Sequence, residues 1–277
     1  MAEAKALTLV CYDGTISGSK TLSSDVGLVI IHHLHRNDFY SLPPDFDDKK
    51  ISGIYILVGD EGDGISKAYI GEAGDVFTRI GQPDHKEKQW WTSVYILSRA
   101  GGELNRAMRL YIENRLINHK GIQRFKLENV KKNSYDKLNQ GDKINAKRIE
   151  KEMIDGCRAI GCRLFDPLSY PISNSENNPD VVFTLRGKKH EAYLVVKESR
   201  FILLPGTKLS PMSDSMTLKG VRALRNTFEG VSVLENEIEF TSPSSAAAFA
   251  AGVNLSGRWE WWNENLDKSL GQWQDGE

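Results

Sequence analysis

The chain has 277 residues, of which 40% are hydrophobic and 26% are charged, as in an ordinary globular protein. Its 36 lysine and arginine residues nearly balance its 37 aspartate and glutamate residues, and the net charge of −1 excludes polyanion binding through overall charge alone. The longest apolar runs, such as residues 26–31, are far shorter than the ~20 residues of a membrane-spanning helix, and the N-terminus does not resemble a signal peptide.

The first 50 residues predict a strand-rich extension that packs on the domain after it, because so short a segment cannot bury a core of its own. Residues 6–12 and 26–33 are rich in β-forming side chains and predict two strands. The sequence Leu-Pro-Pro-Asp at residues 42–45 then breaks the chain before the next strand.

The middle of the chain, residues 51–166, predicts one α+β domain. A loop rich in glycine and aspartate indicates that its first two strands form a hairpin, and Asp75 is a typical N-cap for the helix that follows. β-Forming residues and the helical spacing of apolar residues define the remaining elements. The predicted elements are strands at 51–58, 68–71 and 91–98 and helices at 76–80, 103–119 and 143–159.

Serine, asparagine and proline dominate residues 167–179, which predicts a linker to a second, smaller α+β domain at 180–277. In that domain the pattern predicts strands at 181–185, 193–197 and 201–204 and helices at 218–227 and 245–252. Four tryptophans near the end of the chain are expected in the core, with ligand recognition as the alternative (Trp259, Trp261, Trp262 and Trp273).

Cysteine usage indicates a reducing compartment. Cys11, Cys157 and Cys162 are an odd number in a long chain, so a disulfide framework is not expected and a cytoplasmic location is. No second cysteine or histidine pair lies near Cys157 and Cys162 in the sequence, so a zinc site is not expected there.

Positive charge gathers in residues 115–151, which hold eleven lysines or arginines and four acidic residues, a local charge of +7. Clustered cations of this kind make phosphate contacts in nucleic-acid-binding proteins. A solvated helical surface has the same composition, so charge alone leaves both interpretations open.

A carboxylate lies within an apolar stripe of the helix predicted at 103–119. Glu113 has Leu110 three residues before it and Leu116 three residues after it. Burying a carboxylate costs several kcal/mol unless it is paired or bound to a cation. Either a neighbouring arginine, Arg109 or Arg106, neutralises Glu113, or Glu113 ligates a divalent metal ion.

Three sequence blocks in the middle of the chain resemble the GIY-YIG nuclease family. Residues 53–59 read GIYILVG, residues 69–80 read YIGEAGDVFTRI, and residues 110–117 read LYIENRLI. The resemblance implies a small antiparallel sheet flanked by helices. It also implies an active site of two tyrosines, an arginine, a histidine and a glutamate, which here are Tyr55, Tyr69, Arg79, His85 and Glu113.

The sequence departs from the family pattern in places. The loop between the two tyrosine motifs is somewhat long, and the interval from Arg79 to His85 is two residues longer than expected, with Pro83 inserted. The family often has an asparagine near the metal after the glutamate helix. Both Asn129 and Asn133 are candidates for that residue, and the sequence does not choose between them.

The family resemblance implies phosphodiester hydrolysis with one Mg²⁺ or Mn²⁺ per site. In that scheme Glu113 holds the metal, and Arg79 clamps a phosphate oxygen. Tyr55 activates water with help from His85 or Lys67, and Tyr69 positions the water or the phosphate. A phenol with an ordinary pKa near 10 needs such help from a base or a cation at neutral pH.

Both ends of the chain resemble a bacterial GIY-YIG subfamily that carries a C-terminal domain of unknown function. We therefore expect a DNA endonuclease, acting in defence against foreign DNA or in repair, with a homodimer as an option. The alternatives are an RNA endonuclease and a catalytically weak nucleic-acid-binding module whose C-terminal domain recognises a partner or a modified base. The expected nucleic-acid contacts are Lys67, Arg115, Lys120, Arg124, Lys131 and Lys132.

Overall fold

The computed structural model describes residues 6–276 except 25–26, 49, 61, 63, 120–121, 123–124, 130–137, 167–180, 188–190 and 198. Two compact units make up the chain. The first unit comprises Met1–Gly59, Lys67–Ile122 and Leu127–Asp166, and the second comprises Asp60–Ser66, Gln123–Lys126 and Pro167–Glu277. Each unit contains both strands and helices, so the predicted α+β class is confirmed.

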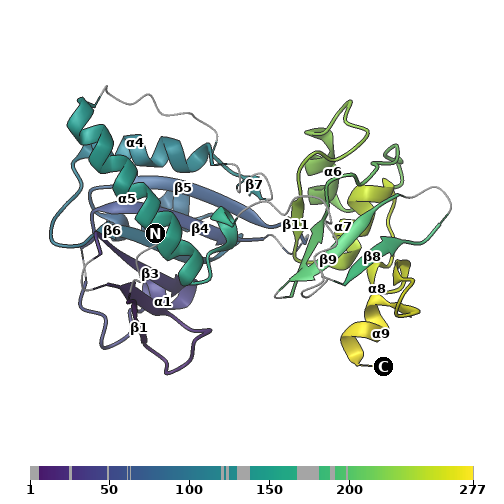
Figure 1. Cartoon of the computed structure of the whole chain (residues 1–277), viewed down its shortest axis with the longest axis horizontal. Coiled ribbons are helices and arrows are strands. Elements are labelled where there is room, and N and C mark those ends of the chain that lie inside the picture. Colours follow the sequence, from purple (N-terminus) through teal and green to yellow (C-terminus); the bar gives the residue numbers. More distant parts are fainter. Residues whose placement is uncertain are drawn as a thin grey trace. The chain divides into compact units, whose positions relative to one another are not determined.

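One seven-stranded sheet forms the centre of the first unit, in the order β1-β2-β3-β6-β4-β5-β7 (Figure 1). Its strands are β1 (Thr8–Cys11), β2 (Lys20–Ser23), β3 (Val29–His35), β4 (Gly53–Gly59), β5 (Lys67–Ala73), β6 (Trp91–Arg99) and β7 (Lys126–Leu127). The N-terminal extension thus supplies three strands of the same sheet that holds the tyrosine motifs, and β2 was not predicted.

Strand direction differs at one edge of this sheet from the wholly antiparallel expectation. Neighbouring strands from β1 to β5 pair antiparallel. At the β7 edge, Lys126 N–H donates to Ser66 O at 2.9 Å and Glu128 N–H donates to Ala68 O at 2.8 Å, so the residue numbers rise together and the pairing is parallel. The sequence pattern could not show this, because a two-residue strand has no periodicity.

The helices of the first unit are α1 (Arg36–Tyr40), α2 (Val76–Ile80), α3 (Pro83–Lys86), α4 (Arg106–Ile117) and α5 (Gln140–Ala159). Side-chain caps fix where three of them begin. Asp75 accepts from the N–H groups of Phe77 and Thr78, which confirms the predicted cap of α2. Asn105 and Asn139 cap α4 and α5, so α4 begins later and α5 earlier than hydrophobic spacing alone predicted.

The two faces of the sheet have different partners. Tyr55 on β4 belongs to a core cluster that includes Phe39 of α1 and Val76 of α2. Ile54 points the opposite way and lies in register with Leu97, which is in register with Ile31. α5 packs closely on Ile31, so α5 covers the face of the sheet opposite to Tyr55, and it contacts α4, which packs along β5.

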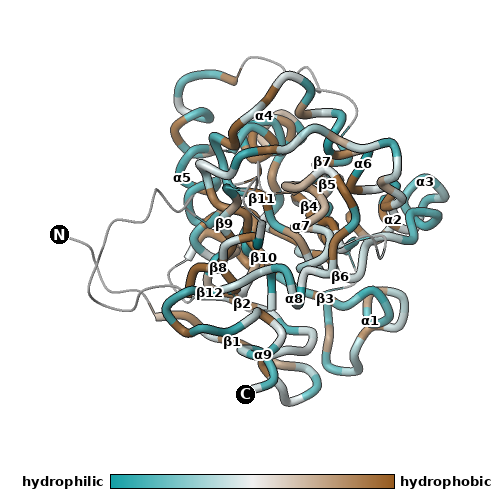
Figure 2. Tube along the Cα trace, turned by 90° about the vertical axis from the view of Figure 1, so that its right-hand side faces the viewer, coloured by the Kyte–Doolittle hydropathy of each residue, from teal (hydrophilic) through white to brown (hydrophobic). Residues whose placement is uncertain are grey.

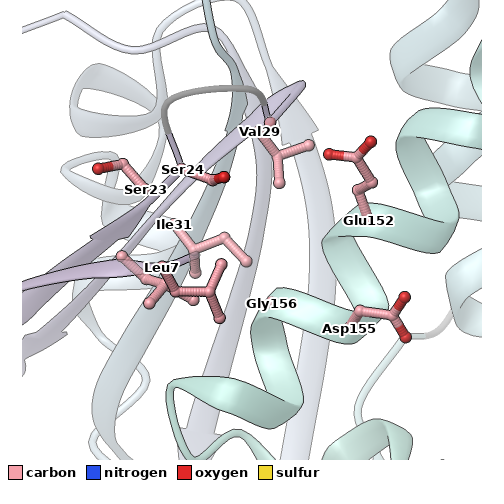
Figure 3. A pocket seen from close by; sticks show the side chains of 10 residues that line it. Leu7, Ser23, Ser24, Val29, Ile31, Glu152, Asp155 and Gly156 are labelled. Carbon is pink, nitrogen blue, oxygen red and sulfur yellow. The ribbon is translucent and has the colours of Figure 1, made fainter. Parts of the chain in front are cut away.

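Gly156 lies inside α5 at the point where this helix packs closely on the sheet. A Cβ atom on Gly156 would lie 2.5 Å from Cδ1 of Ile31, so only glycine allows the helix so near to the sheet. Beside this contact lies a small, mainly apolar cavity of about 60 Å³ between β2, β3 and α5 (Figure 3). Glu152 at its rim accepts a hydrogen bond from Leu28 N–H at 2.8 Å, so this carboxylate supports the backbone before β3.

The second unit has a six-stranded antiparallel sheet in the order β11-β10-β9-β8-β12-β13. Its strands are β8 (Val182–Leu185), β9 (Tyr193–Lys197), β10 (Arg200–Leu203), β11 (Ile238–Phe240), β12 (Trp261–Asn263) and β13 (Lys268–Ser269). Its helices are α6 (Lys219–Asn226), α7 (Pro243–Ala251), α8 (Gly257–Glu260) and α9 (Leu270–Asp275). Trp261 is fully buried as expected, whereas Trp259 is largely exposed.

The loop that joins β4 to β5 belongs to this second unit. Ile65 is buried in its core and forms a β-bridge with Phe240, and Gly64 O accepts from Thr241 N–H at 2.6 Å. The expected boundaries placed this loop inside the domain at 51–166. The expected linker at 167–179 lies outside the described residues. No described helix combines the length and the apolar character that crossing a membrane requires.

Candidate active site

Both tyrosine motifs contain a glycine that permits a close approach. A Cβ atom on Gly71 would lie 2.3 Å from the hydroxyl oxygen of Tyr55, which reaches over β5 from the paired strand β4. A Cβ atom on Gly53 would lie 2.2 Å from Leu97 O on β6. The glycines therefore keep three strands close together and leave room for the phenol of Tyr55.

Tyr55, Tyr69 and His85 form one cluster. The Tyr55 hydroxyl lies 2.8 Å from Nε2 of His85, and both side chains are buried. The rings of Tyr55 and Tyr69 stack with centroids 6.1 Å apart, and the ring of Tyr69 meets that of His85 edge-on at 5.0 Å. The longer interval before His85 leads into the short helix α3, a hydrophilic segment (Figure 2). The imidazole of His85 still reaches the Tyr55 hydroxyl.

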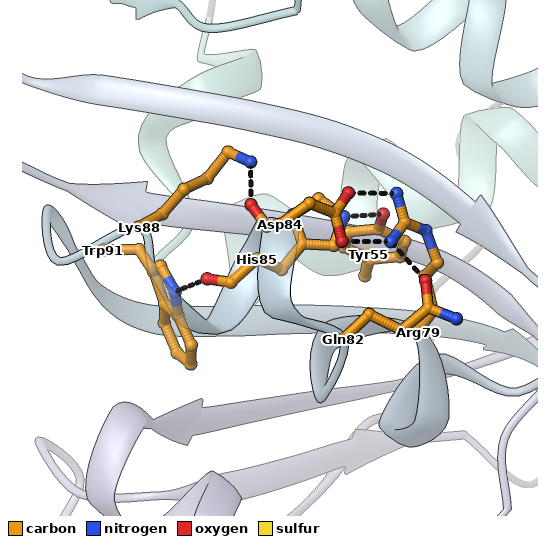
Figure 4. A network of polar contacts seen from close by, with 7 residues as sticks. All are labelled: Tyr55, Arg79, Gln82, Asp84, His85, Lys88 and Trp91. Atoms are coloured by element: carbon orange, nitrogen blue, oxygen red, sulfur yellow. Dashed lines mark hydrogen bonds and ion pairs between the residues drawn. The ribbon is translucent and has the colours of Figure 1, made fainter.

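Arg79 lies beside this cluster on α2, and its guanidinium is held by Asp84. Nη1 donates to Oδ1 of Asp84 at 2.8 Å and Nη2 donates to Oδ2 at 2.8 Å, a two-pronged pair drawn in Figure 4. Nη1 also donates to Oε1 of Gln82 at 2.7 Å. A carboxylate in this position fills the fork that would hold two phosphate oxygens.

Asp84→Asn is expected to uncover the fork of Arg79. The Asp84 side chain is 55% exposed, and an exposed ion pair contributes only about 0–1 kcal/mol, so the gain in free guanidinium is about twofold to fivefold. The rate at which phenylglyoxal modifies Arg79, measured by peptide mass spectrometry, reports it. Glu87→Gln removes an exposed carboxylate from the same segment and should leave the rate unchanged. Equal rates for the two variants would mean that Asp84 does not cover Arg79.

Hydrogen bonds and burial shift the pKa values of the ionisable groups at the site. The Arg79 hydrogen bonds lower the pKa of Asp84 to about 2, so its carboxylate stays ionised. Burial raises the pKa of Tyr55, with Tyr69 and Glu113 acting in the same direction and Arg79 opposing them. Burial also raises the pKa of Tyr69, which Arg79 opposes. Both phenols are therefore neutral at pH 7 and need a proton acceptor to ionise.

His85 is a suitable acceptor, since it is neutral at pH 7. Burial lowers the pKa of His85 to about 4, and the positive charge of Arg79 adds to this shift. Its Nε2 atom faces the Tyr55 hydroxyl, while its Nδ1 atom is buried and has no hydrogen-bond partner within the described part of the chain. Nε2 can therefore take up the phenolic proton when the ring adopts the Nδ1–H tautomer.

Glu113 on α4 is buried at 3% exposure and lies within electrostatic range of both tyrosines, whose pKa values it raises. The arginine that was one candidate to neutralise it is engaged elsewhere. Arg109 Nε donates to Glu72 at 2.7 Å, and its Nη1 donates to Ser52 at 3.0 Å and to Leu104 O at 2.6 Å. Arg79 and Glu113 both act on the two tyrosines, and His85 contacts Tyr55, so the structure brings all five expected site residues into one region.

The donor chemistry at Glu113 fits a hard divalent cation. A single buried carboxylate oxygen suits Mg²⁺ or Mn²⁺, since such ions keep several waters and take their remaining ligands from substrate phosphate. Groups of three or more His, Cys, Asp or Glu side chains able to hold a metal are absent from the residues described.

Of the six expected nucleic-acid contacts, two lie within the described residues, and each of these two pairs with a glutamate. Lys67 is buried at 2% exposure and pairs with Glu128 at 3.8 Å, so it is not a surface contact for phosphate. Arg115 is partly exposed but pairs with Glu150 and lies over the Tyr111 ring. The other four expected contacts lie outside the described residues (Lys120, Arg124, Lys131 and Lys132).

Of the two asparagines, Asn129 has a structural role and Asn133 lies outside the described residues. The side-chain oxygen of Asn129 accepts from Ile70 N–H at 3.0 Å, and its amide donates to Ile70 O at 2.7 Å. Asn129 thus extends the sheet beside Tyr69 by mimicking one residue of a neighbouring strand.

Two residues at the site were missed from the sequence. Asp84 and Gln82 both contact Arg79, and both lie in the inserted interval before His85. A carboxylate three to five residues from a helical arginine could have indicated the pair, but short loops do not fix side-chain direction. Searches with protein-family models, curated proteins and solved structures gave no match to this chain.

Proposed function

We propose that this protein is a GIY-YIG-type endonuclease that hydrolyses phosphodiester bonds, with DNA as its substrate. The observation that carries the proposal is the cluster of Tyr55, Tyr69, Arg79, His85 and Glu113. Five residues from two strands and three helices meet, although they are spread over 59 positions of the chain. Phosphodiester hydrolysis needs these groups: a proton acceptor, a phosphate clamp and a cation ligand.

Proton transfer would run through Tyr55. Its hydroxyl accepts a hydrogen bond from the attacking water and passes its own proton to Nε2 of His85, 2.8 Å away. The neutral state of His85 supports this role, whereas its low pKa makes it a weak base in the absence of substrate. A cation nearby would lower the pKa of Tyr55, and the negative charge of a bound phosphate would raise the pKa of His85, so the two would act on opposite partners of the same proton transfer.

Arg79 would bind a non-bridging phosphate oxygen after Asp84 has swung away. Guanidinium forks accept phosphate in the same two-pronged geometry as carboxylate, and the Asp84 pair is exposed and therefore weak. Tyr69 is half-buried beside Tyr55, where its hydroxyl can orient the water or the phosphate. Glu113 would hold Mg²⁺ or Mn²⁺. Such an ion, when bound, stabilises charge on the leaving oxygen.

Because α5 covers the face of the sheet opposite to Tyr55, its cations would contact the substrate only where the substrate extends past the edge of the sheet. Lys143, Lys147, Arg148 and Lys151 are exposed on this helix, as the high local charge of the sequence predicted. Such contacts are sequence-independent and weaken with salt.

Tyr55→Phe tests the proposal, because it removes one oxygen atom and leaves the packing intact. We expect the wild type to cleave plasmid DNA with Mg²⁺ or Mn²⁺. The variant should lose about a hundredfold in rate, the lower end of what general acid–base groups contribute. Tyr95→Phe is the matched control, a buried tyrosine on β6 that packs against His33 and should retain activity.

The same assay separates the alternatives when single-stranded DNA and RNA are included. Cleavage of RNA alone would replace the DNA assignment by an RNA endonuclease. Binding without cleavage of any substrate would favour a nucleic-acid-binding module. If Tyr55→Phe cleaves as fast as the wild type, the role of Tyr55 is wrong.

A further inference from the structure

Arg36, at the start of α1, donates hydrogen bonds to the backbone of the segment that carries His85, residues 83–91. Its Nη1 donates to Lys88 O at 2.6 Å and to Trp91 O at 3.2 Å, and its Nη2 donates to Lys86 O at 2.9 Å. Its guanidinium also lies over the Trp91 ring at 4.4 Å from the centroid. Arg36 has no carboxylate partner among the described residues, so backbone carbonyls and the indole take up its charge.

The segment needs this support because it has little stability of its own. α3 is a helix of four residues, and so short a helix does not persist without tertiary contacts. The carbonyl groups near its C-terminal end lack helical partners, and Arg36 satisfies Lys86 O and Lys88 O among them. A positive charge beside a helix C-terminus is also favourable.

The contacts continue from Arg36 to the site in two steps. Trp91, held beneath the guanidinium, donates its Nε1–H to His85 O at 3.3 Å (Figure 4). On the other side of the same residue, Nε2 of His85 meets the Tyr55 hydroxyl at 2.8 Å. The backbone of His85 is thus fixed by Trp91, and Trp91 is fixed by Arg36.

We propose that Arg36 is a positioning residue of the active site, through which the N-terminal strands hold His85 against Tyr55. This inference rests on the proposed function for its kinetic consequences, whereas the geometry stands without it. The N-terminal extension then has a role beyond covering the sheet, because β3 ends where Arg36 begins and so sets the place of the guanidinium.

Arg36→Ala should release the segment and displace His85 while the sheet remains folded. We expect kcat to fall by about tenfold to a hundredfold, as for misplacement of a catalytic group by about 1 Å. DNA affinity, measured with EDTA present to prevent cleavage, should stay within about twofold, since Arg36 touches no expected phosphate contact. Arg36→Lys keeps the charge but presents one donor group in place of a fork, and should give an intermediate kcat.

Chemical modification gives a readout that does not depend on nuclease activity. Diethylpyrocarbonate should leave the buried His85 unmodified in the wild type and modify it in Arg36→Ala at a rate close to that of the exposed His35. Trypsin cleaves after Arg79 and Lys86, and the resulting peptide, residues 80–86, contains His85 as its single histidine. Mass spectrometry of that peptide assigns the reaction.

Arg158→Ala is the matched control. Arg158 lies on α5 and also grips a backbone carbonyl, donating from Nε to Phe165 O at 2.9 Å, but that carbonyl belongs to no site segment. We expect it to lower the melting temperature without changing kcat or the His85 reaction. If Arg36→Ala leaves His85 protected, or if its kcat matches that of Arg158→Ala, the proposal is wrong. An inactive wild type would overturn the proposed function, and the His85 reaction would still decide the role of Arg36.

Discussion

Glu113→Gln is expected to abolish metal-dependent cleavage, with a loss of about a thousandfold or more. The substitution keeps the shape of the side chain and removes the charge that would hold Mg²⁺ or Mn²⁺, and a bound metal contributes several kcal/mol to the stability of the transition state. DNA binding without metal should be unchanged, because Glu113 is buried at 3% exposure. Single-turnover cleavage and DNA binding measured side by side separate the two effects.

Direct metal binding gives the second measurement for Glu113. Titration with Mn²⁺ should show one site per chain in the wild type and a much weaker one in the variant. Glu150→Gln is the matched control, since Glu150 is another buried helical glutamate of the first unit and pairs with Arg115. A Glu113→Gln variant that cuts DNA at the wild-type rate would show that the metal ligand lies elsewhere.

Acid is expected to unfold the first unit between pH 6.5 and pH 4. Burial lowers the pKa of His32 to about 4 against the opposing charge of Asp48. Burial also lowers the pKa of His33 to about 4, with His35 and Lys20 acting in the same direction. Burial gives His85 a pKa of about 4 as well. Each ring is neutral in the folded protein at a pH where the unfolded chain, with an ordinary histidine pKa of about 6.5, is protonated.

The unfolded chain binds protons at these three histidines more readily than the folded protein does. Below pH 6.5 the unfolded state binds up to three more protons than the folded state at these sites, so the free energy of unfolding falls as the pH falls. At its steepest the slope is about 4 kcal/mol per pH unit, and each histidine contributes at most about 3 kcal/mol. Those losses are comparable with the whole stability of a domain, about 5–15 kcal/mol.

Urea unfolding at a series of pH values measures this loss in the first unit alone if the probe is labelling of its thiols by a disulfide reagent that reacts at acid pH. Every cysteine of the chain lies in that unit, and Cys157 and Cys162 are buried. His33→Phe should flatten the slope by about one proton, because a phenyl ring can stack on Tyr95 as the imidazole does at 4.6 Å. His35→Phe, at an exposed position of the same strand, controls for loss of a histidine. A stability that is flat from pH 7 to pH 4 would contradict the expectation.

The sequence predicted the elements with strong local signals. The Asp75 cap, the hairpin of the two tyrosine motifs and the strand at 91–98 are all present, because each depends on neighbouring residues. β2 and β7 were missed for the opposite reason. Their four and two residues carry no clear alternation, and they are strands because β3 and β5 offer free edges.

For the candidate site, the sequence indicated which residues but not their partners. Tyr55 and His85 are 30 residues apart, and their contact depends on how α3 folds over Trp91. For Lys67, the residue was expected as a nucleic-acid contact, but its side-chain direction was not foreseen. A lysine at the start of a strand suggests an exposed charge, but here it faces inward to Glu128. Side-chain direction at such positions is set by tertiary packing, which no local pattern encodes.

The chain crosses between its two units five times, since residues 60–66 and 123–126 interrupt the first unit. A fragment that ends at Asp166 would therefore contain the first unit together with two segments of the second unit. Such a fragment would keep Ile65, an apolar side chain that is 1% exposed in the whole protein, without the strand that contains Phe240. The unit that carries the tyrosine motifs is interwoven with the rest of the chain, so shortened versions need a redesigned β4–β5 turn as well as a new C-terminus.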